Sequence, residues 1–153
     1  RLPKGTVLDV AMGEGRNGVF LAGKGFRVIG IDISERGLQK AKALAAERGV
    51  TIQTRVADLD EVHFEKDAYD VVLCTYYLDR NLIPKMKEAV RSGGMVVMET
   101  YTMDHQRYRP EFQKDYLLKP NELLDLFRDF KVLRYQVEDT GQAVFASIIA
   151  QKP

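Results

Sequence analysis

A glycine-rich loop between a predicted strand and a predicted helix constrains this chain more than any other feature of its sequence. Residues 7–21 read VLDVAMGEGRNGVFL, a buried strand followed by a loop of small residues and then a helix. Small residues let backbone N–H groups approach a ligand, and the N-terminus of the helix favours negative charge. Asp9 lies just before the loop, near the edge where open parallel sheets bind ligands. This mixture suits a ligand that carries both a carboxylate and a positive centre.

The rest of the chain alternates strands with helices, which predicts a mostly parallel sheet with helices on both faces. Strands are expected at residues 6–11, 26–33, 51–57, 68–75 and 95–101, and helices at residues 16–24, 34–48 and 82–90. The order then changes to a long polar loop, a short helix and an antiparallel hairpin, at residues 102–119, 121–130, 131–137 and 143–150. We therefore expect one domain.

Composition narrows the class of protein. The chain has 153 residues, of which 45% are hydrophobic, and this is enough for one domain with a full core. Its 23 Lys and Arg residues nearly balance its 22 Asp and Glu residues, so we expect no nucleic-acid partner. No apolar run approaches the roughly 18–20 residues that a membrane span needs, so we expect no membrane partner. The single cysteine, Cys74, excludes an internal disulfide framework and favours a cytoplasmic location.

Two kinds of nucleotide-like ligand fit the glycine loop. Residues 13–18 match G-x-G-x-x-G, and Asp32 ends the second predicted strand about 20 residues later, which is the fingerprint of dinucleotide binding. In that fingerprint, however, the glycines follow the strand almost at once. Here Asp9 stands between strand and loop, with Ala11 and Met12 after it. A nicotinamide-dependent oxidoreductase therefore remains as an alternative interpretation.

Five ordered motifs resemble those of class I S-adenosylmethionine (SAM)-dependent methyltransferases, at residues 7–21, 28–34, 57–59, 69–74 and 90–97. Within that class, residues 15–17, 76–80 and 117–123 are similar to the small tellurite-resistance-like (TehB-like) methyltransferases. The resemblance implies a Rossmann-like, doubly wound α/β fold with a seven-stranded sheet in the order 3-2-1-4-5-7-6. It also implies SAM as cofactor, S-adenosylhomocysteine (SAH) as its product, and in-line methyl transfer to a small-molecule substrate.

The resemblance places the amino-acid end of SAM at the glycine loop. Gly13 and Gly15 are expected to let the backbone approach the cofactor, with Arg16 and Asn17 opening the helix behind them. Arg16 is a candidate partner for the SAM carboxylate, although a solvated arginine is an equally simple interpretation. Asp9 is expected to hold the amino group, with bracing of the loop as its alternative role.

The adenosine end is expected at the ends of the second and third strands. Asp32 is predicted to accept both ribose hydroxyls, with Ile33 beside it, and the alternative is a charge that favours the helix behind it. Asp58 is predicted to accept the adenine amino group while the Leu59 N–H also contacts the base. A solvated acidic turn is the alternative for Asp58. Cys74, at the end of the fourth strand, is expected below the methyl group as a packed thiol rather than a nucleophile.

Methyl transfer depends mainly on aligning the nucleophile, the methyl group and the sulfur, so the protein needs little acid–base chemistry. The candidate catalytic residues follow the fourth and fifth strands and are Tyr76, Tyr101, His105 and Arg107. His105 is a candidate to deprotonate the substrate, and Arg107 to hold an anionic group on it. The alternative for both residues is a solvent-exposed position with no contact to the substrate. We expect the loop at residues 102–119 to be a mobile lid, and no metal site.

The sequence departs from the family pattern in two places, and each departure leads to a further expectation. The class usually has glycine where Ala11 stands, and the alanine is tolerated if its φ angle stays negative. The family also usually carries an N-terminal helical segment, so we expect residues 1–153 to be a single methyltransferase domain without that segment. A SAM-binding module without catalytic activity is then a further alternative. The methyl acceptor and the oligomeric state stay open.

Overall fold

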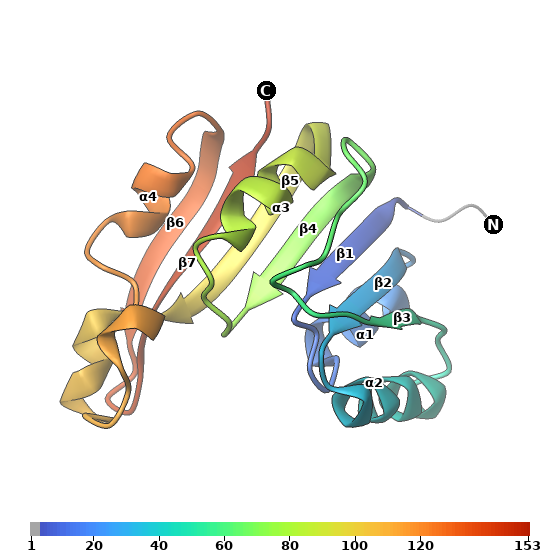
Figure 1. Cartoon of the computed structure of the whole chain (residues 1–153), viewed down its shortest axis with the longest axis horizontal. Helices are drawn as coiled ribbons and strands as arrows, with labels where there is room; N and C mark the ends of the chain where they lie inside the picture. Colours follow the sequence, from blue (N-terminus) through green and yellow to red (C-terminus); the bar gives the residue numbers. More distant parts are fainter. Residues whose placement is uncertain (1–3) are drawn as a thin grey trace.

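The computed structural model describes residues 4–153, which form a seven-stranded sheet in the order β3-β2-β1-β4-β5-β7-β6 (Figure 1). The strands are β1 (Thr6–Val10), β2 (Arg27–Asp32), β3 (Gln53–Val56), β4 (Tyr69–Thr75), β5 (Val90–Tyr101), β6 (Lys131–Asp139) and β7 (Val144–Gln151). The first five pair in parallel, and β7 is antiparallel to both β5 and β6. The predicted fold class and strand order are confirmed.

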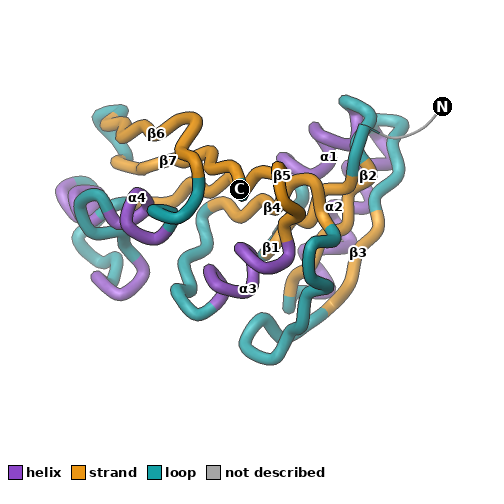
Figure 2. The backbone as a smooth tube through the Cα atoms, turned by 90° about the horizontal axis from the view of Figure 1, so that it is seen from above, coloured by secondary structure: helices purple, strands orange, loops and turns teal. Residues whose placement is uncertain are grey.

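Helices cover both faces of this sheet. They are α1 (Arg16–Gly23), α2 (Glu35–Glu47), α3 (Leu82–Ala89) and α4 (Glu122–Leu126), with short 3-10 helices η1 (Met103–Arg107) and η2 (Lys114–Tyr116). Figure 2 shows α1 and α3 on opposite sides of the central strands. Leu38 of α2 packs with Val7 and Leu73 in one core, whereas Met86 of α3 packs with Leu8 in the other. None of the helices in residues 4–153 is long and apolar enough to cross a membrane.

Part of the sheet on the α1 side carries no helix from the described residues. Along β5 and β7, buried residues alternate with partly exposed ones. The buried residues, such as Met98 and Ile148, pack in the core that α3 and α4 share, and so the partly exposed ones occupy the opposite face. Strands buried on both faces are usually continuously apolar, so this alternation indicates one face that water or a ligand reaches.

The segment between β5 and α4 contains η1 and η2 and is tied together at its base, while its mobility without ligand stays a prediction. The N–H of Met103 donates to the carbonyl of Leu118 (2.9 Å), and the N–H of Leu118 donates to the carbonyl of Tyr101 (3.0 Å). Leu117 and Leu118 are fully buried. The segment is therefore closed at its base and fixed by two core leucines, a pairing that periodicity alone does not reveal.

Arg80 anchors this segment to the rest of the domain. Its guanidinium donates to both carboxylate oxygens of Glu122 (2.5 and 2.9 Å), to the carbonyl of Asp115 (2.7 Å) and to the carbonyl of Leu117 (3.0 Å). The Glu122 side chain is mostly buried, at 12% exposed. The ion pair lowers the pKa of the Glu122 carboxyl below its usual value. One planar side chain thus holds both the loop and the start of α4.

Replacing Arg80 tests this anchor. Arg80→Ala leaves the Glu122 carboxylate without its partner and should lower the free energy of unfolding by about 2 kcal/mol. Arg80→Lys should recover only a minor part, because an ammonium group does not reproduce the planar fork. The control is Arg128→Ala, which breaks an exposed pair with Asp125 (3.8 Å) and should cost less than about 0.5 kcal/mol. Urea unfolding measures all three, and equal losses for Arg80→Ala and Arg128→Ala would contradict the anchor.

Candidate functional site

The loop after β1 turns sharply at the carboxyl edge of the sheet. Ala11, Gly13 and Gly15 all have positive φ angles, of 57°, 57° and 83°. The condition under which Ala11 was expected to be tolerated, a negative φ angle, is therefore not met. Directly after β1 ends, the backbone lies against the end of β2, and the N–H of Met12 donates to the carbonyl of Ile31 (3.0 Å). Ala11 takes up this turn in a conformation that favours glycine.

Close packing fixes the loop from behind. A Cβ atom added to Gly15 would lie 2.5 Å from the Cβ of Ala41 in α2, and one added to Gly30 would lie 2.0 Å from the sulfur of Met12. Gly15 therefore lets the loop touch α2, and Gly30 makes room for the Met12 side chain against β2. The first helix begins directly after Gly15, so its free N–H groups are aimed at the loop.

Asp32 joins the loop to the end of β2. One oxygen of its carboxylate accepts a hydrogen bond from the N–H of Gly13 (2.8 Å), and the other accepts one from the N–H of Ser34 (2.9 Å). Ser34 in turn caps α2, because its hydroxyl accepts from the N–H of Gly37 (3.0 Å). The carboxylate is thus oriented by backbone groups on two sides and keeps lone pairs for further donors.

A small cavity of about 170 Å³ lies beside this carboxylate. It brings together four of the predicted cofactor-binding residues and three neighbours, namely Asp32, Ile33, Asp58 and Leu59 with Ala11, Asp60 and Tyr77. Asp58 closes its own turn, since its carboxylate accepts from the N–H of Asp60 (2.9 Å). The ends of β2 and β3 therefore form one concave site, as expected of parallel strands whose carboxyl ends share an edge.

Asp9 is buried beneath α1, at 3% exposed. Burial and, to a smaller extent, the nearby charge of Asp32 raise the pKa of its carboxyl to about 7, against the opposing effect of a hydrogen bond from the backbone of Gly18. A Cβ atom added to Gly18 would lie 2.8 Å from a carboxylate oxygen of Asp9. Asp9 therefore packs against the helix start, which fits the bracing role as well as the predicted contact with a ligand.

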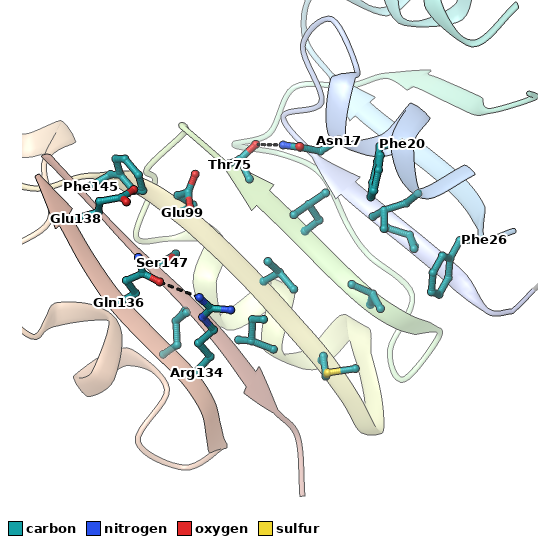
Figure 3. A pocket seen from close by; sticks show the side chains of 18 residues that line it. Asn17, Phe20, Phe26, Thr75, Glu99, Arg134, Gln136, Glu138, Phe145 and Ser147 are labelled. Carbon is teal, nitrogen blue, oxygen red and sulfur yellow. Dashed lines mark hydrogen bonds between the residues drawn. The ribbon is translucent and has the colours of Figure 1, made fainter. Parts of the chain in front are cut away.

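A larger cavity of about 630 Å³ lies over the open face of the sheet (Figure 3). Its floor comes from β4, β5 and β7, and its sides from α1 and β6. Asn17, at the start of α1, donates a hydrogen bond to the hydroxyl of Thr75 (3.1 Å) where the cavity meets the glycine loop. Glu99 lies next to Thr75 in the sheet and accepts a hydrogen bond from the hydroxyl of Tyr76 (2.6 Å). The two cavities thus flank one end of β4.

The structure packs three of the four predicted catalytic residues, Tyr76, Tyr101 and His105, in a row. None of the four lines either cavity. Tyr76 is 46% exposed and lies beside Tyr101, with ring centres 5.0 Å apart. His105 is buried, stacks on Tyr101 with ring centres 4.0 Å apart, and accepts from the N–H of Val144 through Nδ1 (3.1 Å). Burial lowers the pKa of the His105 imidazole. These contacts favour a structural role at the junction of η1 and β7, so substrate deprotonation by His105 stays a prediction without support here.

Arg107, Arg16 and Cys74 lie outside both cavities. Arg107 pairs with Asp139 in the hairpin (2.8 Å), and Arg16 is exposed at the first residue of α1. Cys74 is buried in the core that contains α3, and burial raises the pKa of its thiol to about 12. Its side chain faces away from the larger cavity, because alternate residues of β4 point to opposite faces. In residues 4–153 no group of three or more metal-ligating side chains occurs.

Sequence reasoning missed Glu99. The signal was available, because this charged residue interrupts the apolar run of β5 two positions before its end. A charge within a central strand is costly unless it faces water or a ligand. Its partner Tyr76 was predicted, but their hydrogen bond depends on a positive φ angle of 56° at Tyr76, which the sequence does not reveal.

The burial of Asp9 predicts an unusual pH dependence of stability. The carboxyl has a pKa of about 7 in the folded chain and an ordinary value of 3.8, so the folded state holds the proton more tightly. Stability associated with Asp9 is present at low pH and is lost as the pH rises. Relative to Asp9→Asn, the wild type should lose up to roughly 4 kcal/mol of unfolding free energy between about pH 4 and about pH 8. Chemical denaturation at several pH values measures this difference, with Asp60→Asn as an exposed control. A constant difference between wild type and Asp9→Asn would contradict the prediction.

Comparison with known proteins places this geometry in a family. The model of the methyltransferase domain family matches residues 7–94. A ubiquinone biosynthesis O-methyltransferase from Rickettsia conorii is 27% identical over 146 residues, covering 82% of this chain and 50% of that protein. A probable S-adenosyl-L-methionine-dependent methyltransferase TehB from Haemophilus influenzae is 25% identical over 166 residues, covering 95% of this chain and 57% of that protein.

The fold is also similar to that of a solved protein structure. The crystal structure of TehB from Haemophilus influenzae superposes with a TM-score of 0.81 at 23% identity, covering 99% of this chain and 58% of that one. The chain spans about half to three-fifths of the length of the curated relatives it matches. The family model covers more than half of the chain, including the glycine loop and the ends of the first four strands. The chain therefore belongs to the methyltransferase domain family, and it resembles TehB in sequence and fold.

Proposed function

We propose that this chain binds SAM across the carboxyl ends of β1, β2 and β3 and transfers its methyl group to a small-molecule acceptor. One observation carries the proposal: Ala11 at the start of the glycine loop, Asp32 and the turn at Asp58 line a single cavity in a chain of the methyltransferase domain family. The near-neutral charge of the chain, +1, favours a small molecule over a nucleic acid as the acceptor. A cytoplasmic location fits the free thiol of Cys74.

The adenosine half of SAM fits the smaller cavity. The Asp32 carboxylate is held by two backbone N–H groups and still has lone pairs for the two ribose hydroxyls. Ile33 is 64% exposed, and its apolar surface offers packing for one face of the adenine ring. Asp58 and the N–H of Leu59 lie at the far side of the same cavity, where an amino group and a ring nitrogen of the base need an acceptor and a donor.

The amino-acid half fits the glycine loop. The N-terminus of α1 has no acidic residue in its first turn, so its free N–H groups favour the SAM carboxylate. Gly13 and Gly15 bring these groups to the loop without intervening side chains. An ammonium group near Asp9 favours the ionised carboxylate, which burial alone disfavours. Binding of the cofactor would then lower the pKa of Asp9, and SAM should bind more weakly as Asp9 becomes protonated below about pH 7.

Methyl transfer places few chemical demands on the chain. SAM supplies an electrophilic methyl group on a sulfonium, and the carbon–sulfur bond breaks with its electron pair remaining on sulfur as a lone pair of the acceptor forms the new bond. Thr75, at the end of β4, lines the larger cavity and accepts a hydrogen bond from Asn17 at the start of α1. The role of the protein is to hold both reactants in line and to keep water from the methyl group.

Removal of the Asp32 charge tests the cofactor site. Asp32→Asn keeps the shape of the side chain but loses charge-assisted hydrogen bonds to the ribose, so SAH should bind at least about tenfold more weakly, or about 1.4 kcal/mol. Asp104→Asn, which removes an exposed carboxylate outside both cavities, should leave binding unchanged. Calorimetric titration measures both. Tight binding of NAD with no binding of SAH would reject the assignment in favour of an oxidoreductase.

A further inference from the structure

The strand β6 forms one end of the sheet and presents a long open edge. Its nine residues pair with β7 on one side, and no strand of residues 4–153 lies on the other side (Figure 1). The strand at the opposite end, β3, has only four residues. Natural sheets usually keep edge strands short or covered, because a row of unpaired backbone groups invites pairing with another chain. The length of β6 therefore favours this edge as a place where a further strand pairs.

Most side chains of β6 are exposed, and they divide between the two faces of the sheet. Arg134, Gln136 and Glu138 lie on the open face, where they line the wall of the larger cavity. Tyr135 packs against the core that α3 and α4 share, so Val137, two residues further on, lies on that same face. Val137 is 54% exposed. An exposed β-branched residue on an edge strand gains apolar contact when a second strand is added beside it.

The regular part of this edge begins at Arg134. The register between β6 and β7 is irregular between Val132 and Arg134, and from Arg134 to Asp139 each residue of β6 has one partner in β7. Irregularities of this kind bend an edge strand, so a strand that adds to β6 would pair with residues 134–139. In residues 4–153 no backbone hydrogen bond from a loop or a helix reaches this segment. Its outward N–H and C=O groups are therefore left for water or for a further strand.

The sequence of this segment is complementary to itself when a second copy runs antiparallel to it. With Gln136 opposite Gln136 of the second copy, Arg134 lies opposite Glu138, and Tyr135 lies opposite Val137. Each of these pairs joins side chains on the same face of the sheet, as antiparallel pairing requires. A two-fold axis makes the ion pair and the apolar pair each occur twice. Opposite charges and aromatic–aliphatic pairs placed in this way stabilise a sheet.

Neighbouring registers lose this charge match. A centre at Tyr135 sets Arg134 opposite Gln136 and brings the irregular part of β6 into the pairing, and a centre at Val137 sets Glu138 opposite Gln136. Within residues 4–153 neither Arg134 nor Glu138 takes part in an ion pair, so both charges remain available. Arg134 donates one hydrogen bond to Gln136 (3.0 Å) and keeps further N–H groups for a carboxylate.

We propose that β6 pairs with β6 of a second copy of this chain, antiparallel and about a two-fold axis at Gln136, so that one continuous sheet crosses the dimer. The contacts between Arg134 and Glu138 set the register, and those between Tyr135 and Val137 add apolar contact on the other face. An axis perpendicular to the sheet keeps both open faces on one side, so the larger cavities of the two copies lie side by side. A contact made by one short strand segment is small, and the dimer is therefore a weak one. This inference goes beyond the proposed function and does not depend on a bound cofactor.

Charge reversal and mixing test the pairing. Arg134→Glu sets carboxylates against each other at both symmetric contacts, and Glu138→Arg does the same with guanidinium groups, so each variant alone should dimerise at least about tenfold more weakly than the wild type. An equimolar mixture of the two variants restores opposite charges at both contacts and should associate about as well as the wild type. Sedimentation equilibrium from micromolar to millimolar concentration measures all of these. Arg55→Glu, an exposed reversal on the β3 edge, is the matched control and should leave association unchanged.

Three results would overturn the inference. The first is a wild type that stays monomeric up to millimolar concentration. The second is association that neither reversal weakens, which would place the contact on another surface, such as the open face of β5 and β7. The third is a mixture that stays monomeric like its components, because the two charges would then not meet across the axis. Thermal unfolding checks that each variant is folded. If one reversal does not fold, Val137→Lys takes its place, since it sets a charge against Tyr135 of the second copy and should weaken dimerisation at least about tenfold. Unchanged association of Val137→Lys would equally overturn the inference.

Discussion

Pairing of β1 with β2 on one side and with β4 on the other determines where the glycine loop, Asp32 and Thr75 lie. Leu8 and Val10 are fully buried, so β1 is held in the centre of the sheet by its own core contacts. Because the pairs are parallel, the ends of β1, β2 and β4 meet at one edge. The glycine loop, Asp32 and Thr75 follow directly from these ends. A shift of β1 by one residue would turn its buried side chains to the opposite faces and would remove Asp9 from beneath α1.

The two strained positions of this edge lie where the proposed ligands would meet the chain. Ala11 and Tyr76 both hold positive φ angles, one after β1 and the other after β4. Asp9 is a third unfavourable feature, because its carboxyl is buried close to the negative charge of Asp32. Such costs persist only where the surrounding structure enforces them, and they collect at functional sites. The opposite edge of the sheet also holds one such residue, Asp67, with a φ angle of 51°, close to the surface ion pair of Arg91 with Asp70.

The resemblance to class I methyltransferases implied the strand order, and the features that follow from this order could be predicted. Asp32 and Asp58 could be brought together in advance because the carboxyl ends of neighbouring parallel strands share an edge. The register of the antiparallel hairpin could not be predicted in the same way. The alignment of Ser147 with Glu99 and Gln136 depends on the pairing of β7 with both neighbours and on an irregularity between Val132 and Arg134.

Local conformation limited the rest of the prediction. His105 lies on a 3-10 helix that turns it inward onto Tyr101, whereas its polar neighbours suggested an exposed loop. Leu117 and Leu118 are adjacent and therefore show no helical or strand period, yet both are core residues that fix the loop. Ala11 adopts the left-handed region, although an alanine there was expected to be tolerated only with a negative φ angle, and the next residue, Met12, hydrogen-bonds to Ile31 of β2. In each case a long-range contact outweighed the local preference.

The central claim is that SAM occupies the carboxyl edge between the glycine loop and the turn after β3. Titration of the nitrogen-15-labelled protein with SAH, followed by amide NMR, tests it most directly. The account predicts saturable shifts at the amides of Gly13 and Ser34, which donate to Asp32, and at Leu59 in the same cavity. The amide of Gly141 in the distant hairpin turn should stay unchanged. Shifts confined to other parts of the chain, or larger shifts at the same three amides with NAD than with SAH, would contradict it.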